Sequence, residues 1–399
     1  GCLDMSESKQ ATEFRTDLRS WLAQNCPEGV RDGAEPNVET TPWGSSTIEL
    51  DRDSRIWLER MAERGFTVPT WPVEYGGAGL DRELYPVLIE ELKRINARAP
   101  LTGRGVNYIG PTILEMGTDA QKARWLPGIA RGEGGWAMGY SEPGAGSDLA
   151  SLSCRADLNG DHYVINGRKV WTSDAMDCDY IFILARTDPQ APQHLGISLL
   201  LVDMHQAGVQ VSPIRLLSGA SPFNETVFEN AIASADDVIG GVNNGWTVGK
   251  RLLQFERSTH AGINTSGSQG GRASDSALPK QMQPYLSDQP ALRRSLVKHQ
   301  MAFAAQRLTQ QRVIEETAAN APGFASSAVK LSNALITQAG DELLINALGT
   351  QGVGWEGEFK TTELTATRTW LKQKSLTIAG GTMEVQKNII AKRVLGLPD

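Results

Sequence analysis

The sequence has few of the residues that mark disulfide-rich, metal-binding or nucleic-acid-binding proteins. Its 399 residues include only 4 cysteines and 5 histidines, with no CxxC pair and no metal-ligand spacing. Lys and Arg never run beyond two in a row, and the formal net charge is -7. A nucleic-acid-binding surface therefore has little support, although a local basic pocket for a phosphate stays open. We expect reduced thiols and no metal site.

Long apolar runs are also missing. No stretch approaches the roughly 20 apolar residues that a membrane span needs, and no secretory signal opens the sequence. We therefore expect a cytoplasmic protein. What is present is an ordinary globular composition, 40% hydrophobic and 21% charged. Because the chain exceeds the size at which one hydrophobic core stops growing, two or three packed domains are expected.

The period of the apolar residues divides the chain into three parts. A helical spacing of three and four, as at Leu84, Val87, Leu88 and Leu92, predicts an N-terminal α-helical domain over residues 5–133. Short β-branched runs predict a central antiparallel β domain over residues 134–245. The helical period then returns and predicts a C-terminal helical bundle over residues 246–399. The expected fold class is a multi-domain α+β protein with a β-barrel-like centre and a four-helix bundle.

Within the β domain we expect several short strands. Residues 162–165 form one, Asn166-Gly167 is a typical tight turn, and Lys169 begins the return strand. Further strands are expected over 180–185, 197–202 and 209–211.

Two segments of the β domain carry candidate chemistry. The loop WAMGYSEPGAGSD, Trp136 to Asp148, has small residues whose backbone N–H groups and hydroxyls suit flat polar rings or phosphates. From spacing alone, a plain turn remains an equal alternative. Trp171-Thr172-Ser173 then ends a predicted strand and brings an aromatic ring and two hydroxyls together. A tryptophan there is a core residue or the wall of a cofactor site.

Four motifs together resemble the acyl-CoA dehydrogenase family. They are the loop WPVEYGGAGL at 71–80, SEPGAGSD at 141–148, the stretch INGRKVWTS at 165–173 and GGTMEVQKNIIAKRVLGLP at 380–398. They occur in the family's order and cover nearly the whole chain. The resemblance implies an FAD-dependent α,β-dehydrogenation of an acyl-CoA thioester to the 2-enoyl-CoA, with electrons passed to an electron-transfer flavoprotein. The family's helical, β and helical-bundle domains agree with the three parts above.

The resemblance also implies which residues meet FAD. One group comes from the β domain and one from the start of the last helix, where Thr382 is a good N-cap. The cofactor-binding residues implied in this way are Met138, Tyr140, Ser141, Ser147, Trp171, Ser173, Thr382 and Glu384. Ser147 would also lie near the CoA arm of the substrate.

The catalytic base departs from the commonest family pattern. Where many members carry a glutamate, this chain has Gly380, which cannot take a proton but keeps the backbone N–H that holds the thioester oxygen in the family. The resemblance to members with a second solution places the base at Glu256, directly before Arg257, a candidate substrate-binding residue. The helical spacing predicts a buried apolar stripe on this helix, formed by Val248, Leu252, Phe255 and Thr259. Glu256 lies beside this stripe, where burial would raise its pKa. From spacing alone, a solvated Glu256–Arg257 pair remains the alternative.

A second departure concerns the far end of the cofactor. The family's Arg-x-x-Phe-Gly, which reaches the FAD pyrophosphate of a neighbouring subunit, is missing from ALPKQMQPYLSDQ at 277–289. A chain that keeps the base but lacks this arginine resembles the base-bearing subunit of bacterial heterotetramers that oxidise steroid side-chain CoA thioesters. A homotetramer in which Lys280 or another cation takes the role is the alternative. Gly380 opens the pocket floor, which suits a bulky or branched acyl group.

Two other functions stay open on the same fold. The first is a non-catalytic subunit that completes the FAD site of a partner, against which Glu256 argues. The second is other flavin chemistry, such as that of an acyl-CoA oxidase. These differ in how the reduced flavin reacts with oxygen, which a sequence does not disclose.

Overall fold

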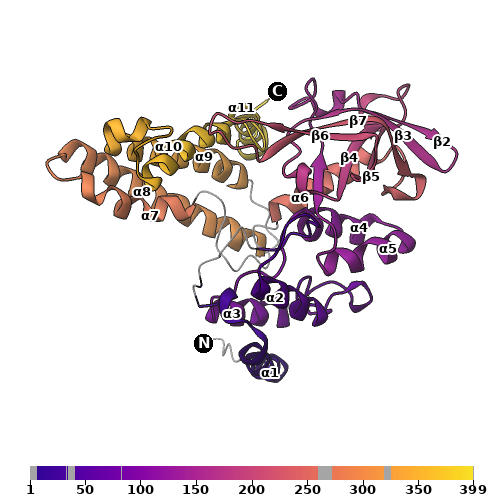
Figure 1. The fold of residues 1–399 in the computed structure, drawn as a ribbon, viewed down its shortest axis with the longest axis horizontal. Coiled ribbons are helices and arrows are strands. Elements are labelled where there is room, and N and C mark those ends of the chain that lie inside the picture. The colour runs from indigo at the N-terminus through magenta and orange to yellow at the C-terminus, as the bar shows by residue number, and fades with distance from the viewer. Residues whose placement is uncertain are drawn as a thin grey trace. The chain divides into compact units, whose positions relative to one another are not determined.

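The protein is described by a computed structural model over residues 7–32, 34, 41–81, 83–258, 272–318 and 325–398 (Figure 1). For residues 256–258, 272–276, 314–318 and 325–326 the description covers the backbone only. The chain divides into two compact units, Gly1–Ile214 with Pro222–Gly267 and Arg215–Ser221 with Ser268–Asp399. None of the described helices is both long enough and apolar enough to cross a membrane.

The first unit begins with helices whose starts are set by side-chain caps. Ser8 and Asp51 each accept a hydrogen bond from a backbone N–H of the first turn, and Thr118 forms a reciprocal capping box with Gln121. The helices are α1 (Lys9–Asn25), α2 (Arg52–Glu63), α3 (Leu84–Arg94), α4 (Gly110–Met116) and α5 (Asp119–Ala130). Their apolar stripes bury a core that contains Leu18, Leu22, Trp57, Met61, Leu88 and Leu92. The predicted helical N-terminal part is confirmed.

The glycines of the loop at 71–80 serve packing within this unit. Gly76 has a φ of +96°, and a Cβ there would lie 2.7 Å from the Cβ of Ala130 in α5. A Cβ at Gly77 would overlap the carbonyl of Trp71. These glycines therefore allow the loop to approach a helix and itself, and no ligand is needed to explain them.

The β part forms one curled sheet in the order β6-β7-β3-β2-β4-β5-β8, with β1 paired to β4. The strands are β1 (Trp136–Gly139), β2 (Arg155–Asn159), β3 (His162–Lys169), β4 (Tyr180–Arg186), β5 (Ile197–Asp203), β6 (Val209–Ile214), β7 (Phe223–Ser234) and β8 (Val238–Ile239). The strands expected near 180, 197 and 209 are confirmed. Most pairs are antiparallel as predicted, but β1 runs parallel to β4 and β2 meets β4 in a single parallel bridge.

The predicted hairpin at Asn166-Gly167 is wrong. β3 runs unbroken through both residues, with an irregularity in its pairing to β7 between Ile165 and Gly167. The tight turn instead joins β2 to β3 at Gly160, whose φ is +65°. Gly167 is needed for a different reason, since a Cβ there would lie 2.7 Å from the Cα and Cβ of Cys154. The Asn-Gly signal therefore marks a close approach between β3 and the segment before β2.

The sheet separates two apolar cores. Alternate residues of β4 point to opposite faces, so that Phe182 and Leu184 join the core beneath the helices while Ile181 and Ile183 join the core enclosed by the curled sheet. Helix α6 (Gly245–Ser258) packs on the first core. Of the stripe predicted for this helix, Val248 and Leu252 are fully buried and Phe255 is half-buried, whereas Thr259 lies outside the described residues.

The second unit is helical. It consists of α7 (Arg272–Met282), α8 (Pro290–Ala318), α9 (Ala325–Leu348), α10 (Thr361–Gln373) and α11 (Met383–Ile389), which ends in a π-turn over Ile390–Val394. The short segment Arg215–Ser221 also belongs here, because Arg368 of α10 donates to the carbonyls of Ser218 and Trp355 and stacks on the Trp355 ring. The helical C-terminal part of the prediction is confirmed.

Candidate active site

A buried ion pair anchors the loop that follows β1. Lys169 has no exposed surface, and its Nζ lies 2.9 Å from Glu142 Oε1 and 2.9 Å from the carbonyl oxygen of Tyr140. Glu142 also accepts hydrogen bonds from the backbone N–H groups of Ser153 and Cys154. Burial raises the pKa of Glu142, but the Lys169 charge and these donors outweigh it and hold the pKa below its usual value. The loop is therefore fixed at its base.

The tip of the same loop is open. Glu142 and Ala145 exchange two backbone hydrogen bonds across a tight turn, at 2.9 and 3.1 Å. In the described part of the chain, a Cβ placed at Gly144 or Gly146 would meet no heavy atom of a non-adjacent residue within 4 Å, and Ser147 is exposed. The turn therefore presents backbone and hydroxyl groups to space that a ligand could fill. Met138 and Ser141, nearer the base, are half-buried.

Trp171 lies at the surface and not in the core. Its side chain is 54% exposed and its φ is +59°. Its ring packs edge to face on the Phe223 ring, with 5.9 Å between the ring centres. A large residue in the left-handed region is an outlier that the surroundings must hold in place. The next residue does this, because the buried Thr172 hydroxyl bonds the carbonyl of Asn224 at 3.0 Å. Ser173 is half-buried beside it.

The loop after β1 is joined to α6 through Tyr140. This buried side chain donates from its hydroxyl to the carbonyl oxygen of Gly249 over 3.2 Å. A Cβ at Gly249 would lie 3.3 Å from that hydroxyl and 3.2 Å from Leu184, so glycine permits the close contact. Helix α6 continues to Ser258, and position 256 comes seven residues after Gly249. Seven residues make about two turns, so both positions share one face of the helix.

An ion pair to α4 connects the turns of α6 before position 256 to the neighbouring helix. Arg251 makes a bidentate ion pair with Glu115 of α4, at 2.6 and 2.9 Å, and its guanidinium lies 4.4 Å from the centre of the Phe255 ring. The side chains of Glu256 and Arg257 lie outside the described residues. Their backbone is helical, so the structure places their positions on α6 and no more.

In the second unit, Gly380 and Gly381 form a left-handed turn before α11. Their φ angles are +68° and +97°, and the backbone N–H of Gly380 has no acceptor among the described residues. Thr382 caps α11 by accepting from the N–H of Val385 at 3.1 Å, as predicted, and Glu384 stands exposed in the first turn. Within the described part of the chain, the turn therefore presents a backbone donor that no acceptor occupies.

Lys330 of α9 stabilises this turn through two hydrogen bonds. Its Nζ donates to the carbonyl oxygens of Leu376 at 2.9 Å and Gly381 at 3.2 Å. A Cβ placed at Gly380 would lie 3.7 Å from the Lys330 Cε, and apart from the adjacent residues no other atom of the described part of the chain would lie within 4 Å of it. Burial lowers the pKa of Lys330, which is half-buried.

The structure thus brings the predicted residues together in two groups. The first unit holds Met138, Tyr140, Ser141, Ser147, Trp171, Ser173 and the positions of Glu256 and Arg257; the second holds Gly380, Thr382 and Glu384. Sequence reasoning missed Glu142, Lys169 and Lys330. Glu142 and Lys169 lie within the motifs singled out above, but nothing in their spacing indicates that they pair. Among the described residues, no group of three His, Cys, Asp or Glu could hold a metal ion.

Comparison with family models covers the three parts of the chain. Residues 11–133 match the acyl-CoA dehydrogenase N-terminal domain, residues 137–231 the middle domain and residues 243–395 the C-terminal domain. The chain is 37% identical over 389 residues to the acyl-CoA dehydrogenase IpdE1 of Mycobacterium tuberculosis, a match that covers 97% of each protein.

Two solved structures have the same fold over essentially the whole chain. One is the Tcur3481-Tcur3483 steroid ACAD, with a TM-score of 0.71 and 28% identity, covering 99% of this chain and 100% of the other. The other is the ChsE4-ChsE5 complex from Mycobacterium tuberculosis, with a TM-score of 0.70 and 27% identity, covering 100% of both chains.

Proposed function

The chain belongs to the acyl-CoA dehydrogenase family, whose three domains it contains, and we propose that it oxidises an acyl-CoA thioester to the 2-enoyl-CoA with FAD. The observation that carries this proposal is the link from Tyr140 to Gly249. It joins the open loop after β1 to the face of α6 that contains position 256. The loop proposed to bind the ring and the helical position proposed for the base therefore belong to one packed unit.

The residues of the first unit fit a flat cofactor. The exposed Trp171 ring and the open turn at Gly144 and Gly146 provide an aromatic surface and accessible backbone donors. We infer that Met138, Tyr140, Ser141, Trp171 and Ser173 would hold the isoalloxazine, with Ser147 between flavin and CoA. Thr382 and Glu384 would meet the adenosine end. When bound, FAD supplies the acceptor for the β-hydrogen as hydride.

Glu256 is the proposed base. An α-proton of a thioester is too weakly acidic for a carboxylate in water, so the developing charge on the carbonyl oxygen needs a donor. The free N–H of Gly380 is the proposed donor, and Lys330 fixes the turn that carries it. Arg257 would lie beside the base and bind the substrate. Gly380 leaves room for a branched or bulky acyl group, and a steroid side chain is the proposed class.

The proposed assembly is a tetramer with a related but different subunit, and an electron-transfer flavoprotein is the proposed electron acceptor. The missing Arg-x-x-Phe-Gly supports the unlike subunit, because this chain then lacks the cation that family members supply to the FAD of a neighbouring subunit. Its likeness to chains of the two complexes above supports it too. Lys280, exposed in α7, is the cation that a homotetramer would use instead.

The experiment is anaerobic titration of the purified chain, alone and with a co-expressed related subunit, against acyl-CoAs from short chain to steroid-derived. We expect bound flavin to bleach on addition of a bulky acyl-CoA only when the second subunit is present. Flavin reduction by this chain alone would exclude the obligate heteromer. Bound flavin that no acyl-CoA reduces would favour the non-catalytic subunit, and rapid reaction of reduced flavin with oxygen would favour an oxidase.

A further inference from the structure

An ion pair joins the helical part of the first unit to the segment that follows Trp171. Arg104 comes shortly before α4, and its Nη1 and Nη2 lie 3.3 and 3.2 Å from Asp174 Oδ2. Nη1 also lies 3.5 Å from the carbonyl oxygen of Trp136, the first residue of β1. The Arg104 side chain is 20% exposed, so protein covers most of its surface. The guanidinium is therefore held in one place by two neighbouring segments.

Both partners of this pair stand where the backbone departs from its ordinary forms. Arg104 directly precedes the π-helical turn Gly105–Ile109, and such turns are rare and frequent at functional sites. Asp174 has a φ of +59°, and its backbone N–H donates to the carbonyl oxygen of Pro222 at 3.0 Å. A left-handed residue other than glycine persists where surrounding contacts hold it. Two irregular segments thus bring one cation and one carboxylate together.

The pair lies next to the segments proposed to bind flavin and to supply the base. Asp174 directly follows Ser173 in the chain. Ile109 of the π-helical turn belongs to the same apolar core as Leu252 of α6, and the turn packs against that helix. An acyl group that lies between the flavin segment and α6 would therefore come within reach of Arg104.

Part of the hydrogen-bonding capacity of the pair is unused. An arginine side chain has five N–H donors, and a carboxylate has two acceptor oxygens. Within the described part of the chain, no hydrogen bond involves Arg104 Nε or Asp174 Oδ1. The pair thus offers at least one donor and one acceptor. A purely apolar ligand group packed against it would remove both from water without a partner, which is unfavourable.

The charge balance of the pair favours a neutral ligand oxygen over a carboxylate. Asp174 already compensates the Arg104 charge, so a second carboxylate would meet a like charge. A ketone accepts a hydrogen bond from the guanidinium without displacing Asp174. A hydroxyl group accepts from the guanidinium and donates to the carboxylate. This chemistry fits an acyl group that carries a neutral oxygen.

We propose that Arg104 and Asp174 determine substrate specificity by binding a ketone or hydroxyl oxygen that the acyl group carries away from its thioester. This inference rests on the proposed dehydrogenation and narrows its substrate from a bulky acyl group to an oxygenated one. The pair selects the substrate, and the proton transfer stays with Glu256.

The test compares matched acyl-CoAs in the assembly that retains FAD. The substrates are 3-cyclohexylpropionyl-CoA and its 4-oxo, 4-hydroxy and 4-carboxy ring derivatives, and the measurement is kcat/KM with a dye as electron acceptor. We expect the oxo and hydroxy compounds to exceed the unsubstituted one by about tenfold or more, and the carboxy compound to be the poorest. Arg104→Met brings the ratio of oxo to unsubstituted compound to about one. Arg131→Met, on an exposed arginine that pairs with Glu133 in the same unit, leaves this ratio at its wild-type value.

Asp174→Asn is the second variant, because it keeps the shape of the side chain and removes its charge. The Arg104 charge is then uncompensated, so the carboxy compound should gain on the oxo compound by about tenfold. This reversal is measured independently of Arg104→Met, and the wild-type comparison needs no variant at all.

Three outcomes overturn the proposal and leave the proposed dehydrogenation standing, because flavin is still reduced in each. Equal kcat/KM of the wild type for the oxo, hydroxy and unsubstituted compounds shows that no ring oxygen is recognised. A wild-type preference for the carboxy compound makes the pair an anion site. An oxo preference that survives in folded Arg104→Met places the oxygen-binding group elsewhere. Reduction by none of the four compounds, in an assembly whose flavin dithionite reduces, contradicts both the dehydrogenation and this inference.

Discussion

Lys169 Nζ lies 2.9 Å from Glu142 Oε1, with both side chains buried. The pair connects the last residue of β3 to the loop after β1, so the position of the open turn depends on it. A buried pair is weak evidence for stability as a whole, but the loss of one partner leaves the other charge uncompensated. The pair therefore anchors the candidate cofactor loop to β3.

Lys169→Met is expected to lower the free energy of unfolding by roughly 3 to 5 kcal/mol, because Glu142 is then buried without its cation. Denaturant unfolding of Lys169→Met, Glu142→Gln and the double variant measures this. The double variant should lose clearly less than the sum of the single losses. Strict additivity would show that the two side chains act independently.

Trp171→Ala is expected to leave the fold intact and to weaken flavin retention. The side chain is half in solvent and its backbone is strained, so its removal costs little, about 1 kcal/mol or less. Flavin content after dialysis and Tm are the two measurements, with Trp171→Phe as the control that keeps an aromatic ring. A large fall in Tm with flavin content unchanged would make Trp171 a structural residue.

The sequence predicted the elements that have a strong local period. The apolar runs of β4 and β5 and the stripe at Val248 and Leu252 of α6 lie where the spacing places them. The boundaries 133/134 and 245/246 and the individual site roles stay predictions. The hairpin prediction failed because Asn-Gly is typical of a tight turn, whereas glycine is needed at position 167 because a Cβ there would overlap Cys154.

The parts that sequence reasoning missed depend on contacts between distant segments. Glu142 and Lys169 are 27 residues apart, and Lys330 holds a carbonyl 51 residues away. No local propensity encodes such pairs. Trp171 was not predicted to be exposed either. The sequence pattern after a strand does not distinguish a buried aromatic from an exposed one, and it does not indicate the left-handed backbone that Trp171 adopts.

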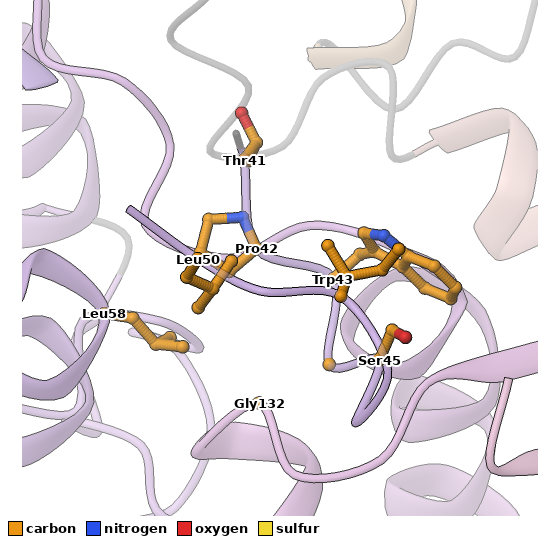
Figure 2. Close-up of a pocket in the computed structure, with 9 residues that line it drawn as sticks. Thr41, Pro42, Trp43, Ser45, Leu50, Leu58 and Gly132 are labelled. Atoms are coloured by element: carbon orange, nitrogen blue, oxygen red, sulfur yellow. The ribbon is translucent and has the colours of Figure 1, made fainter. Parts of the chain in front are cut away.

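A small cavity in the N-terminal part was likewise not predicted (Figure 2). It lies beside Trp43, Leu50 and Leu58 and has a volume of about 30 Å³, which is water-sized.

Lys330→Met is expected to slow flavin reduction about tenfold, roughly 1.4 kcal/mol of barrier, with little change in substrate affinity. The variant frees the Gly381 carbonyl from its donor, and we expect the Gly380 N–H then to turn away from the position proposed for the thioester oxygen. Stopped-flow reduction at several acyl-CoA concentrations separates rate from affinity. Lys330→Arg should recover part of the rate. An equal loss of both parameters, without recovery by arginine, would make Lys330 a general packing residue.

Acid should destabilise the N-terminal helices through Glu91. Burial raises the pKa of this carboxyl, but hydrogen bonds from Arg19, Arg15 and Arg94 outweigh burial and lower it to about 2. Since the folded-state pKa lies below the unfolded value of about 4.3, this stabilisation is complete above that value and is lost as the pH falls toward 2. Thermal unfolding from pH 7 to pH 2.5 should show a fall in Tm that is smaller in Glu91→Gln. An identical slope in both proteins would contradict this.

We propose that the proton-accepting group lies on α6, on the face that Tyr140 contacts at Gly249. Glu256→Gln keeps the shape of the side chain and removes its basicity, and Lys250→Gln, on an exposed residue of the same helix, is the matched control. The measurement is the rate of flavin bleaching after anaerobic mixing with acyl-CoA, in the assembly that retains FAD. We predict that Glu256→Gln slows it by roughly 100- to 10,000-fold with flavin content unchanged, while Lys250→Gln behaves as wild type. Bleaching of Glu256→Gln at the wild-type rate would contradict the account.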